Sequence, residues 1–531
     1  MTVPVPDTSR QSTTSTPLLI LGLVVAIVIA VVGHLLHNSF FHDDAYITLR
    51  YSQNWLEGDG IVWNPGDRVE GYTSFLHLAT VSLLGALRLD LVTATKVIGL
   101  GSYVGICLFS LFCFRSTTQS FFSLRQVLLF LLVPASFPLI AWSYGGLETS
   151  LVTLLVMVSS YTFVASMDHS RKRLVILGLL FALACLARPD VLLLVVITVL
   201  FLLCPRRSKP VGWAAAGIFL AGFAILYLPY FGWRYWYYEE LLPNTFYAKM
   251  TGINLFRLRT GGNYLHTFAR LSPFLLPAAL VSSVVIVRLG KWSWKHAYML
   301  AFILGHSLYI IYTGGDHMPA YRFFVPLIPA MGWLVATGGS ELVNSGRCSS
   351  WVLALLAVVL VLGQGVTKNE RMLNAQRLDP AAAEGADVGH WLKENFPAGS
   401  LIALNTAGST PYYAKQLLFI DMLGLNNKQI AHRRDVPMRT WWQRVTGHAK
   451  GDGKYVLQQQ PDVIILGPAL GLRADPDFVD QENVVWFLSD QELAESGDFK
   501  AQYRQQRVTF KGHSGAQRTL IYYERRADSE P

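Results

Sequence analysis

The sequence predicts a polytopic α-helical membrane protein with a C-terminal α/β domain on the extracytoplasmic side. The chain has 531 residues, of which 52 % are hydrophobic and only 15 % charged, whereas soluble domains average about 25 % charged residues. Apolar runs fill residues 17–366, and the chain becomes polar after that point. We therefore expect a cytoplasmic tail at residues 1–16, a transmembrane part at 17–366 and a soluble domain at 367–531.

The first apolar run, Pro17 to Leu36, is about long enough to cross the hydrocarbon core of a bilayer. A signal peptide is the alternative. The run is longer than a usual signal core, however, only Arg10 precedes it, and no small-residue cleavage site follows it. These features favour an uncleaved anchor.

Later apolar runs predict further helices, several of them membrane-spanning. They lie at residues 72–88, 92–114, 124–142, 147–167, 173–187, 190–204, 212–231, 272–288, 297–313, 323–339 and 350–366.

Basic residues in the short loops set the orientation, because cytoplasmic loops are enriched in Lys and Arg. The basic loops at residues 115–125, 169–173, 205–209 and 288–295 all fall on one side. This requires that Tyr72–Phe114 crosses once, with residues 72–87 forming a juxtamembrane or partly embedded helix, and gives about eleven crossings. The remaining loops and the C-terminal domain then lie on the outer side of the cytoplasmic membrane.

Two other features of the composition have simple explanations. The formal charge of +9 comes with basic residues clustered in short loops, which favours membrane orientation over nucleic-acid binding. The five cysteines show neither metal-ligand spacing nor a disulfide framework.

Asp43 and Asp44 directly follow the first apolar run. Adjacent carboxylates are costly, since each raises the pKa of the other. Capping of a helix start is the alternative role, but one Asp is enough for a cap. Two carboxylates indicate a bound cation or a proton, and a divalent ion, Mg²⁺ or Mn²⁺, is expected here.

Other charged residues collect in the predicted outer loops. Glu148 and Arg188 each have an ordinary alternative, as a helix N-terminal acid and as a snorkelling arginine. The aromatic loop at 233–249 suits a membrane interface, but that does not explain its Pro-Asn-Thr sequence or Lys249. The loop at 314–322 adds an acid, an imidazole and a cation, which indicates a phosphate head group as ligand.

Taken together, the outer face gathers carboxylates, cations and aromatic side chains, and ionisable residues at a membrane boundary are functional candidates. No P-loop, dinucleotide fingerprint or zinc spacing occurs. A cytoplasmic nucleotide-sugar donor is therefore not expected, and the membrane must deliver an activated donor.

In the C-terminal domain, Ser400–Leu404 and Asp462–Leu466 are predicted to be buried strands and Ala381–Asn395 a helix. Residues 405–413 could present backbone amides to an anion or sugar. A simple strand-to-helix turn is the favoured alternative.

At these residues the chain resembles the GT-C class of lipid-linked-sugar glycosyltransferases, and more narrowly the bacterial arabinofuranosyltransferase B family. The resemblance rests on the acidic pair after the first helix and on motifs spread over most of the chain. These are Asp43–Ile47, Trp63–Gly66, Val69–Thr73, Gly146–Thr149, Leu242–Lys249, Gly314–Asp316, Tyr321–Phe323 and Asp421–Leu425.

The resemblance implies transfer of a sugar from a polyprenyl phosphate, most specifically decaprenyl-phosphoryl arabinofuranose, to a cell-envelope glycan or glycoprotein. It implies catalytic roles for Asp43, Asp44 and Glu148, with Asp43 and Asp44 as metal ligands and Lys249, Arg322 and Arg188 on the donor phosphate. The implied substrate-binding residues are Tyr46, Arg50, Asn64, Glu70, Tyr72, Asn244, Tyr247, Asp316, His317 and Tyr321.

Two other functions remain as alternatives. A transporter or flippase of a lipid-linked glycan should show internal repeats and broken helices in corresponding halves, and neither is evident in the sequence. A scaffold of an envelope assembly would leave the clustered acids unexplained.

Overall fold

The computed structural model describes most of the chain. The described residues are 16–112, 123–165, 170–204, 212–249, 255–271, 275–366, 380–445, 447–467, 472–473, 485–513 and 515–526. The predicted cytoplasmic tail (apart from residue 16), the predicted boundary at residue 367 and the basic residues at 115–122 and 205–209 lie outside this set.

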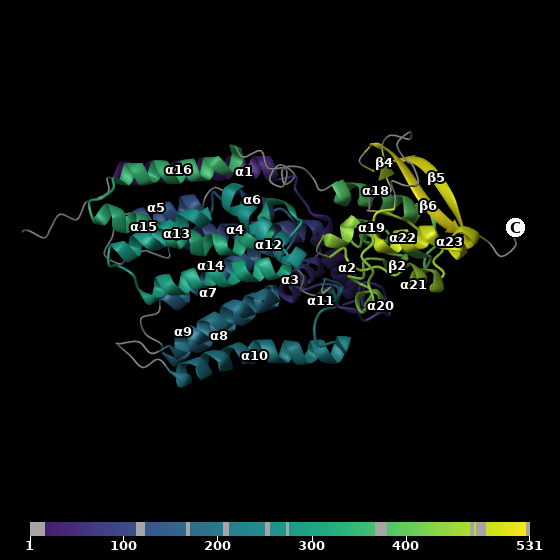
Figure 1. Ribbon diagram of the computed structural model, residues 1–531, viewed down its shortest axis with the longest axis horizontal. Coiled ribbons are helices and arrows are strands. Elements are labelled where there is room, and N and C mark those ends of the chain that lie inside the picture. Colours follow the sequence, from purple (N-terminus) through teal and green to yellow (C-terminus); the bar gives the residue numbers. More distant parts are fainter. Residues whose placement is uncertain are drawn as a thin grey trace, which may run out of the picture.

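Two parts lie side by side along the long axis of the molecule (Figure 1). The first is built of helices, and the second contains the β-sheet. The helices of the first part are α1 (Thr16–His37), α2 (Asp43–Glu57), α3 (Phe75–Ala86), α4 (Leu91–Phe112), α5 (Leu124–Leu132), α6 (Phe137–Trp142), α7 (Thr149–Ala165), α8 (Arg171–Ala187), η1 (Pro189–Val191), α9 (Leu192–Leu203), α10 (Trp213–Tyr238), α11 (Asn244–Lys249), α12 (Leu255–Leu271), α13 (Leu275–Arg288), α14 (Trp294–Thr313), η2 (Pro319–Leu327), α15 (Ile328–Asn344) and α16 (Ser350–Val366).

Four helices among the described residues are long and apolar enough to cross a membrane: Ile20–His37, Leu91–Phe112, Trp213–Tyr238 and Pro319–Asn344. A bent pair, Leu255–Arg270 with Leu275–Arg288, brings the number to five if it counts as one span. The helical membrane architecture agrees with the sequence, while the number of about eleven crossings stays a prediction.

Two of the predicted apolar runs form shorter helices than expected. The run at 124–142 forms two helices, α5 and α6, because Pro134 lies between them and cannot continue a helix. The helix α3 has 12 residues and is too short to cross a bilayer at 1.5 Å per residue.

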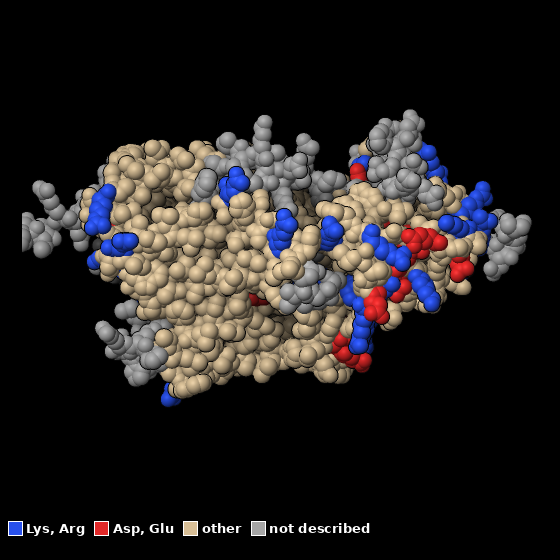
Figure 2. Space-filling view, in the orientation of Figure 1, with Lys and Arg blue, Asp and Glu red and all other residues tan. Residues whose placement is uncertain are grey.

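The surface of the helical part is apolar. In Figure 2 few charged side chains appear on it, whereas Lys, Arg, Asp and Glu gather on the sheet part. Large apolar side chains such as Leu35, Leu108, Leu228 and Leu355 are exposed on its helices. Such a surface is stable only against lipid or another apolar partner.

The sheet part has six strands in the order β2-β1-β3-β6-β4, with β5 paired to β6. The strands β1, β2 and β3 run parallel, and β6 is antiparallel to its neighbours β3, β4 and β5. Its elements are α18 (Pro380–Asn395), β1 (Leu401–Leu404), α19 (Ser409–Tyr413), β2 (Leu418–Asp421), α20 (Lys428–Ala431), η4 (Trp441–Arg444), α21 (Gly453–Gln458), β3 (Val463–Ile464), β4 (Leu472–Arg473), α22 (Leu488–Glu495), α23 (Gly497–Gln502), β5 (Tyr503–Lys511) and β6 (Gln517–Arg525).

This part matches the sequence closely at the helix Ala381–Asn395 and at the first predicted strand. The second predicted strand, Asp462–Leu466, is shorter, because only Val463 and Ile464 pair with neighbours.

The two parts share a hydrophobic core. Tyr51, Trp63 and Tyr72 of the helical part pack in one buried cluster with Ile402 and Phe419 of the sheet part. The junction is therefore a packed interface that fixes how the outer loops meet the sheet domain.

Candidate active site

The acidic pair lies in the first turn of α2, at the junction of the two parts (Figure 1). His42 occupies the N-cap position with extended backbone, and its Nδ1 accepts a hydrogen bond of 3.2 Å from the amide of Asp44. Neither aspartate is the helix cap, so capping does not account for the pair.

Asp43 points into the sheet part. Its Oδ1 accepts hydrogen bonds from the amide (2.9 Å) and the hydroxyl (2.7 Å) of Ser409, and the side chain is buried. Ser409 begins α19 in the turn after β1, the segment whose amides were considered as an anion site. The anion that this turn binds is a carboxylate of the protein itself.

Asp44 points elsewhere. Its carboxylate makes no hydrogen bond or ion pair with any described residue and is partly accessible. Burial raises the pKa of Asp44, but the nearby charges of His42, His317 and Lys249, together with Arg322, outweigh it and hold the pKa below its usual value. The carboxylate is therefore ionised and free to meet a ligand.

The loop after α14 and the following helix η2 supply an ion-paired group next to Asp44. Arg322 Nε donates to Asp316 Oδ2 at 2.9 Å, and His317 Nδ1 lies 3.7 Å from Asp316 Oδ1. Burial alone would raise the pKa of Asp316, but Arg322, His317 and Lys249 lower it to about 2. Asp316 thus keeps Arg322 in place.

Lys249, the last residue of α11, makes no hydrogen bond or ion pair with the described residues. Burial lowers its pKa, and the neighbouring Asp44 partly restores it. An ammonium group that is enclosed yet unpaired is suited to an anionic ligand.

Arg188 completes the group of cations. It forms a bidentate pair with Asp190, at 3.0 and 2.8 Å, and its Nη1 lies 3.9 Å from Glu148 Oε1. The guanidinium groups of Arg188 and Arg322 lie 4.9 and 5.1 Å from the ring centroid of Phe323. Lys249 is close enough for the charges of both arginines to act on it, so the three predicted phosphate-binding residues are neighbours.

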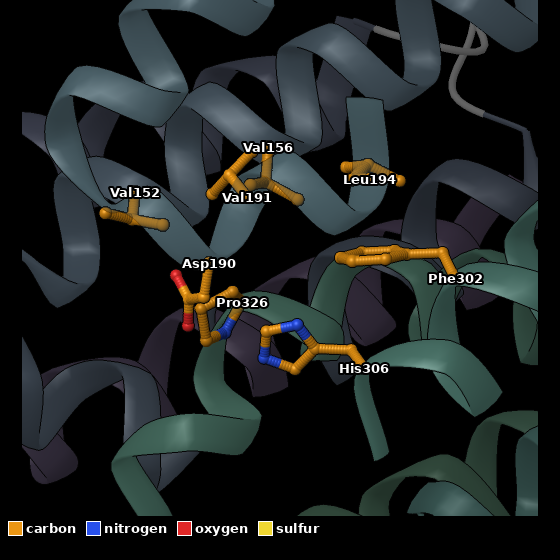
Figure 3. Close-up of a pocket in the computed structure, with 8 residues that line it drawn as sticks. All are labelled: Val152, Val156, Asp190, Val191, Leu194, Phe302, His306 and Pro326. Atoms are coloured by element: carbon orange, nitrogen blue, oxygen red, sulfur yellow. The ribbon is translucent and has the colours of Figure 1, made fainter. Parts of the chain in front are cut away.

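Asp190, the partner of Arg188, lines a small cavity of about 10 Å³, near the size needed for one water molecule (Figure 3). The Asp190 carboxylate and the ring of His306 lie at one end of it, between apolar side chains. The Nε2 atom of His306 has no hydrogen-bond partner among the described residues. This cavity is too small for a substrate.

Four predicted substrate-binding residues make contacts between the two parts, and their role toward a substrate stays a prediction. Arg50 donates to the carbonyls of Trp63, Pro411 and Leu417 and is fully buried. Asn64 exchanges hydrogen bonds with the backbone of Phe419, and Asn244 donates to the carbonyls of Gly424 and Leu425. The Tyr46 hydroxyl lies 3.4 Å from that of Tyr413.

Three others are buried within the helical part or its loops. Glu70 pairs with Arg234 at 2.6 Å, and the Tyr72 hydroxyl accepts from Tyr238 at 3.2 Å. Tyr321 is fully buried at a left-handed φ of 49°, directly after Ala320 at 53°. Two successive non-glycine residues in this region are costly, and such strain is concentrated at functional sites.

Tyr247 and Lys249 line a cavity of about 850 Å³ between the two parts. The loop between α20 and α21 supplies most of the opposite wall. Gly447 in that loop lies against Lys249, because a Cβ at Gly447 would be 3.7 Å from Lys249 Cε. Lys249 therefore belongs both to the wall of this cavity and to the cations around Asp44.

Sequence reasoning did not select His42, Ser409 and Asp190 as site residues. His42 was detectable, since it immediately precedes the acidic pair. Ser409 lies in the turn at residues 405–413 that the sequence offered as a possible anion site, but its partner Asp43 is 366 positions away and could not be read from that pattern.

The chain is similar in sequence to known proteins. Residues 372–522 match a family described as a domain of unknown function, DUF8728. The chain is 27 % identical over 327 residues to a terminal beta-(1->2)-arabinofuranosyltransferase of Mycobacterium tuberculosis. This alignment covers 54 % of the chain, and the chain spans about half the length of that relative.

Solved structures extend the likeness to the whole chain. ArnT from Cupriavidus metallidurans bound to undecaprenyl phosphate aligns with a TM-score of 0.56 at 13 % identity, covering 98 % of this chain and 100 % of that one. The oligosaccharyltransferase AglB from Archaeoglobus fulgidus aligns with 0.52 at 11 % identity, covering 96 % and 75 %.

The chain has the GT-C fold. The resemblance inferred from the motifs is confirmed: the sequence is similar to an arabinofuranosyltransferase, and the structure has the fold of ArnT and AglB.

Proposed function

We propose that the chain is a membrane glycosyltransferase that takes its sugar from a polyprenyl phosphate. One observation carries the proposal: an ionised, unpaired carboxylate, Asp44, faces an enclosed group of cations that includes Lys249 and Arg322. Cations stabilise a departing phosphate, and a carboxylate accepts the proton of an attacking hydroxyl, so sugar transfer needs both kinds of group side by side.

The reaction can be written from these residues. The acceptor oxygen forms a bond to the anomeric carbon of the sugar, and the bond from that carbon to the phosphate oxygen breaks. The polyprenyl phosphate leaves with the electron pair, and Lys249, Arg322 and Arg188 stabilise the negative charge that develops on it. The hydroxyl proton passes to the Asp44 carboxylate.

Donor binding prepares Asp44 for this role. The cations that lower its pKa are the ones proposed to bind the phosphate. Once phosphate charge offsets them, the pKa of Asp44 rises toward the range in which a carboxylate accepts a proton effectively. Asp43 takes no part in this step, because Ser409 already occupies its carboxylate.

The expected Mg²⁺ or Mn²⁺ ion does not fit this arrangement well. No three His, Cys, Asp or Glu side chains in the described part of the chain lie together as metal ligands. Asp43 is bonded to Ser409, and the charge of Asp44 is balanced by cations. We therefore assign no step to a metal, and chelation by EDTA during the transfer assay tests the expectation.

The finer assignment follows the sequence likeness. We propose arabinofuranose as the sugar and a glycan or glycoprotein of the cell envelope as the acceptor, because the curated relative is an arabinofuranosyltransferase. In this proposal the site and the sheet domain face outward from the cytoplasmic membrane.

The test uses purified full-length protein in detergent. Synthetic polyprenyl-phosphoryl arabinofuranose is incubated with an arabinofuranoside acceptor. Polyprenyl-phosphoryl mannose and polyprenyl-phosphoryl glucose are tested in parallel as alternative donors. Transfer of arabinofuranose alone supports the full proposal. Transfer of another sugar keeps the reaction and replaces the sugar, and no transfer from any of the donors contradicts it.

A further inference from the structure

The cavity between the two parts carries a strong imbalance of charge. Lys249 reaches it from the donor site, and the other basic residues that line it are Arg257, Arg433, Arg434, Arg444 and Lys450. No Asp or Glu is among its described lining residues. At about 850 Å³ it has the size of a ligand site.

Several of these cations have no carboxylate partner in the part of the chain that the structure describes. Arg433 has a carboxylate partner, Glu492, at 2.9 Å. Arg434, Arg444 and Lys450 have no carboxylate within 4.0 Å among the described residues. Charges held together without counter-ions repel one another, so an anionic ligand would be favoured there.

Aromatic rings lie among the cations. Tyr247 packs against His432 with the ring centroids 4.2 Å apart, and Arg444 lies 5.2 Å from the centroid of Phe256. Rings of this kind provide the flat, partly apolar surfaces that sugar-binding pockets use for orientation.

We propose that this cavity is the acceptor site of the transferase and that it takes an anionic glycan, one bearing carboxylate or phosphate groups. The inference rests on the proposed function and adds the chemical class of the acceptor. It also gives the domain of unknown function at residues 372–522 a role, since that domain supplies Arg434, Arg444 and Lys450.

The position of the cavity favours a glycan over a lipid headgroup. Most of its wall comes from residues 431–450 of the sheet part, whose surface is charged, and not from the apolar membrane helices. It meets the donor site at Lys249 and Gly314. An acceptor held there would reach the phosphate cluster from the side of the sheet domain.

Binding to the full-length protein tests the proposal without requiring turnover. The probes are tetragalacturonate, the uncharged maltotetraose, and dihexanoyl phosphatidylglycerol as a lipid anion, measured by isothermal titration calorimetry. We expect tetragalacturonate to bind about tenfold or more tightly than maltotetraose, and the double variant Arg434→Gln/Arg444→Gln to lose that preference. The matched control, Arg504→Gln/Lys511→Gln on β5, should keep it.

Equal binding of the two tetrasaccharides overturns the proposal, as does binding of the lipid anion alone. Decyl phosphate serves as a separate probe for the proposed donor site. We expect the Arg434→Gln/Arg444→Gln variant to bind decyl phosphate as the unaltered protein does and Lys249→Met to lose it. Preserved tetragalacturonate binding without sugar transfer from any donor would contradict the proposed function and leave the anionic site standing.

Discussion

Asp43 and Asp44 are neighbours in the chain but have different roles. Successive residues of a helix point about 100° apart, so the first turn of α2 directs one carboxylate to Ser409 and the other to the cations. Asp43 joins the two parts of the molecule, and Asp44 remains available for chemistry. The two aspartates that are adjacent in the sequence therefore belong to two separate sites.

This division predicts opposite effects of alanine at the two positions. Asp43→Ala should lower the stability by about 1.5–3 kcal/mol, because two hydrogen bonds to a buried carboxylate are lost. Asp44→Ala should leave the melting temperature in detergent unchanged and abolish transfer. Asp59→Ala, in an exposed loop, is the control for both measurements, and equal destabilisation by the two substitutions would disprove the division.

A second prediction concerns Lys249 and pH. The pKa of Lys249 is lowered from the usual 10.5, so its ammonium charge is lost at a lower pH than that of an exposed lysine. Binding of decyl phosphate should weaken as pH rises through this lowered pKa. Asp44 raises the pKa of Lys249, so Asp44→Asn should move this loss of binding to lower pH. Titration of decyl phosphate affinity against pH in both proteins measures the shift, and a shift to higher pH would refute the coupling.

Among the elements, α8 and α10 determine where Arg188 is placed, because Arg188 directly follows α8. Gly178 and Gly222 allow these helices to approach closely: an added Cβ would lie 2.3 Å from the Phe219 carbonyl oxygen and 2.5 Å from that of Val175. Close backbone approach through small residues is typical of helix packing in membranes.

Gly178→Ala should therefore push α8 away from α10, lower the melting temperature and reduce transfer by moving Arg188. Gly217→Ala on α10 is the matched control, because a Cβ there would meet nothing within 4 Å. Circular dichroism melting and the transfer assay check the pair. Equal effects of the two substitutions would show that the close approach is unimportant.

At the scale of the whole molecule, one packed interface connects the helical part with the sheet domain. Arg50 lies at its centre and donates to carbonyls on both sides. Its complete burial, which lowers its pKa to about 9, is stabilised by those hydrogen bonds. The account therefore predicts a single cooperative unfolding transition for the two parts.

Arg50→Met should leave these carbonyls without their donor and separate the transition into two, with faster hydrogen exchange in β1 and β2. Arg504→Met on the exposed strand β5 is the control, and it should leave one transition. Two transitions in the unaltered protein would show that the parts are not coupled.

Local patterns in the sequence predicted the helices and the gathering of charged loops on one face. Lys249, Asp316 and Arg322 come together because their loops share that face, which apolar runs and basic loops reveal. The roles of Arg50, Asn64 and Asn244 could not be read in this way. Their partners in the sheet part lie 180 to 367 positions away, and a polar side chain beside a motif looks the same whether it meets a substrate or a distant backbone.

The most direct test of the central claim is the single-turnover rate of sugar transfer in Asp44→Asn, measured alongside the affinity for decyl phosphate. The account predicts a fall of about 10² to 10⁴-fold in the rate, the usual contribution of a positioned base, with phosphate affinity retained. Transfer at the unaltered rate would contradict it, because Asp44 would then take no part in breaking the bond between sugar and lipid phosphate.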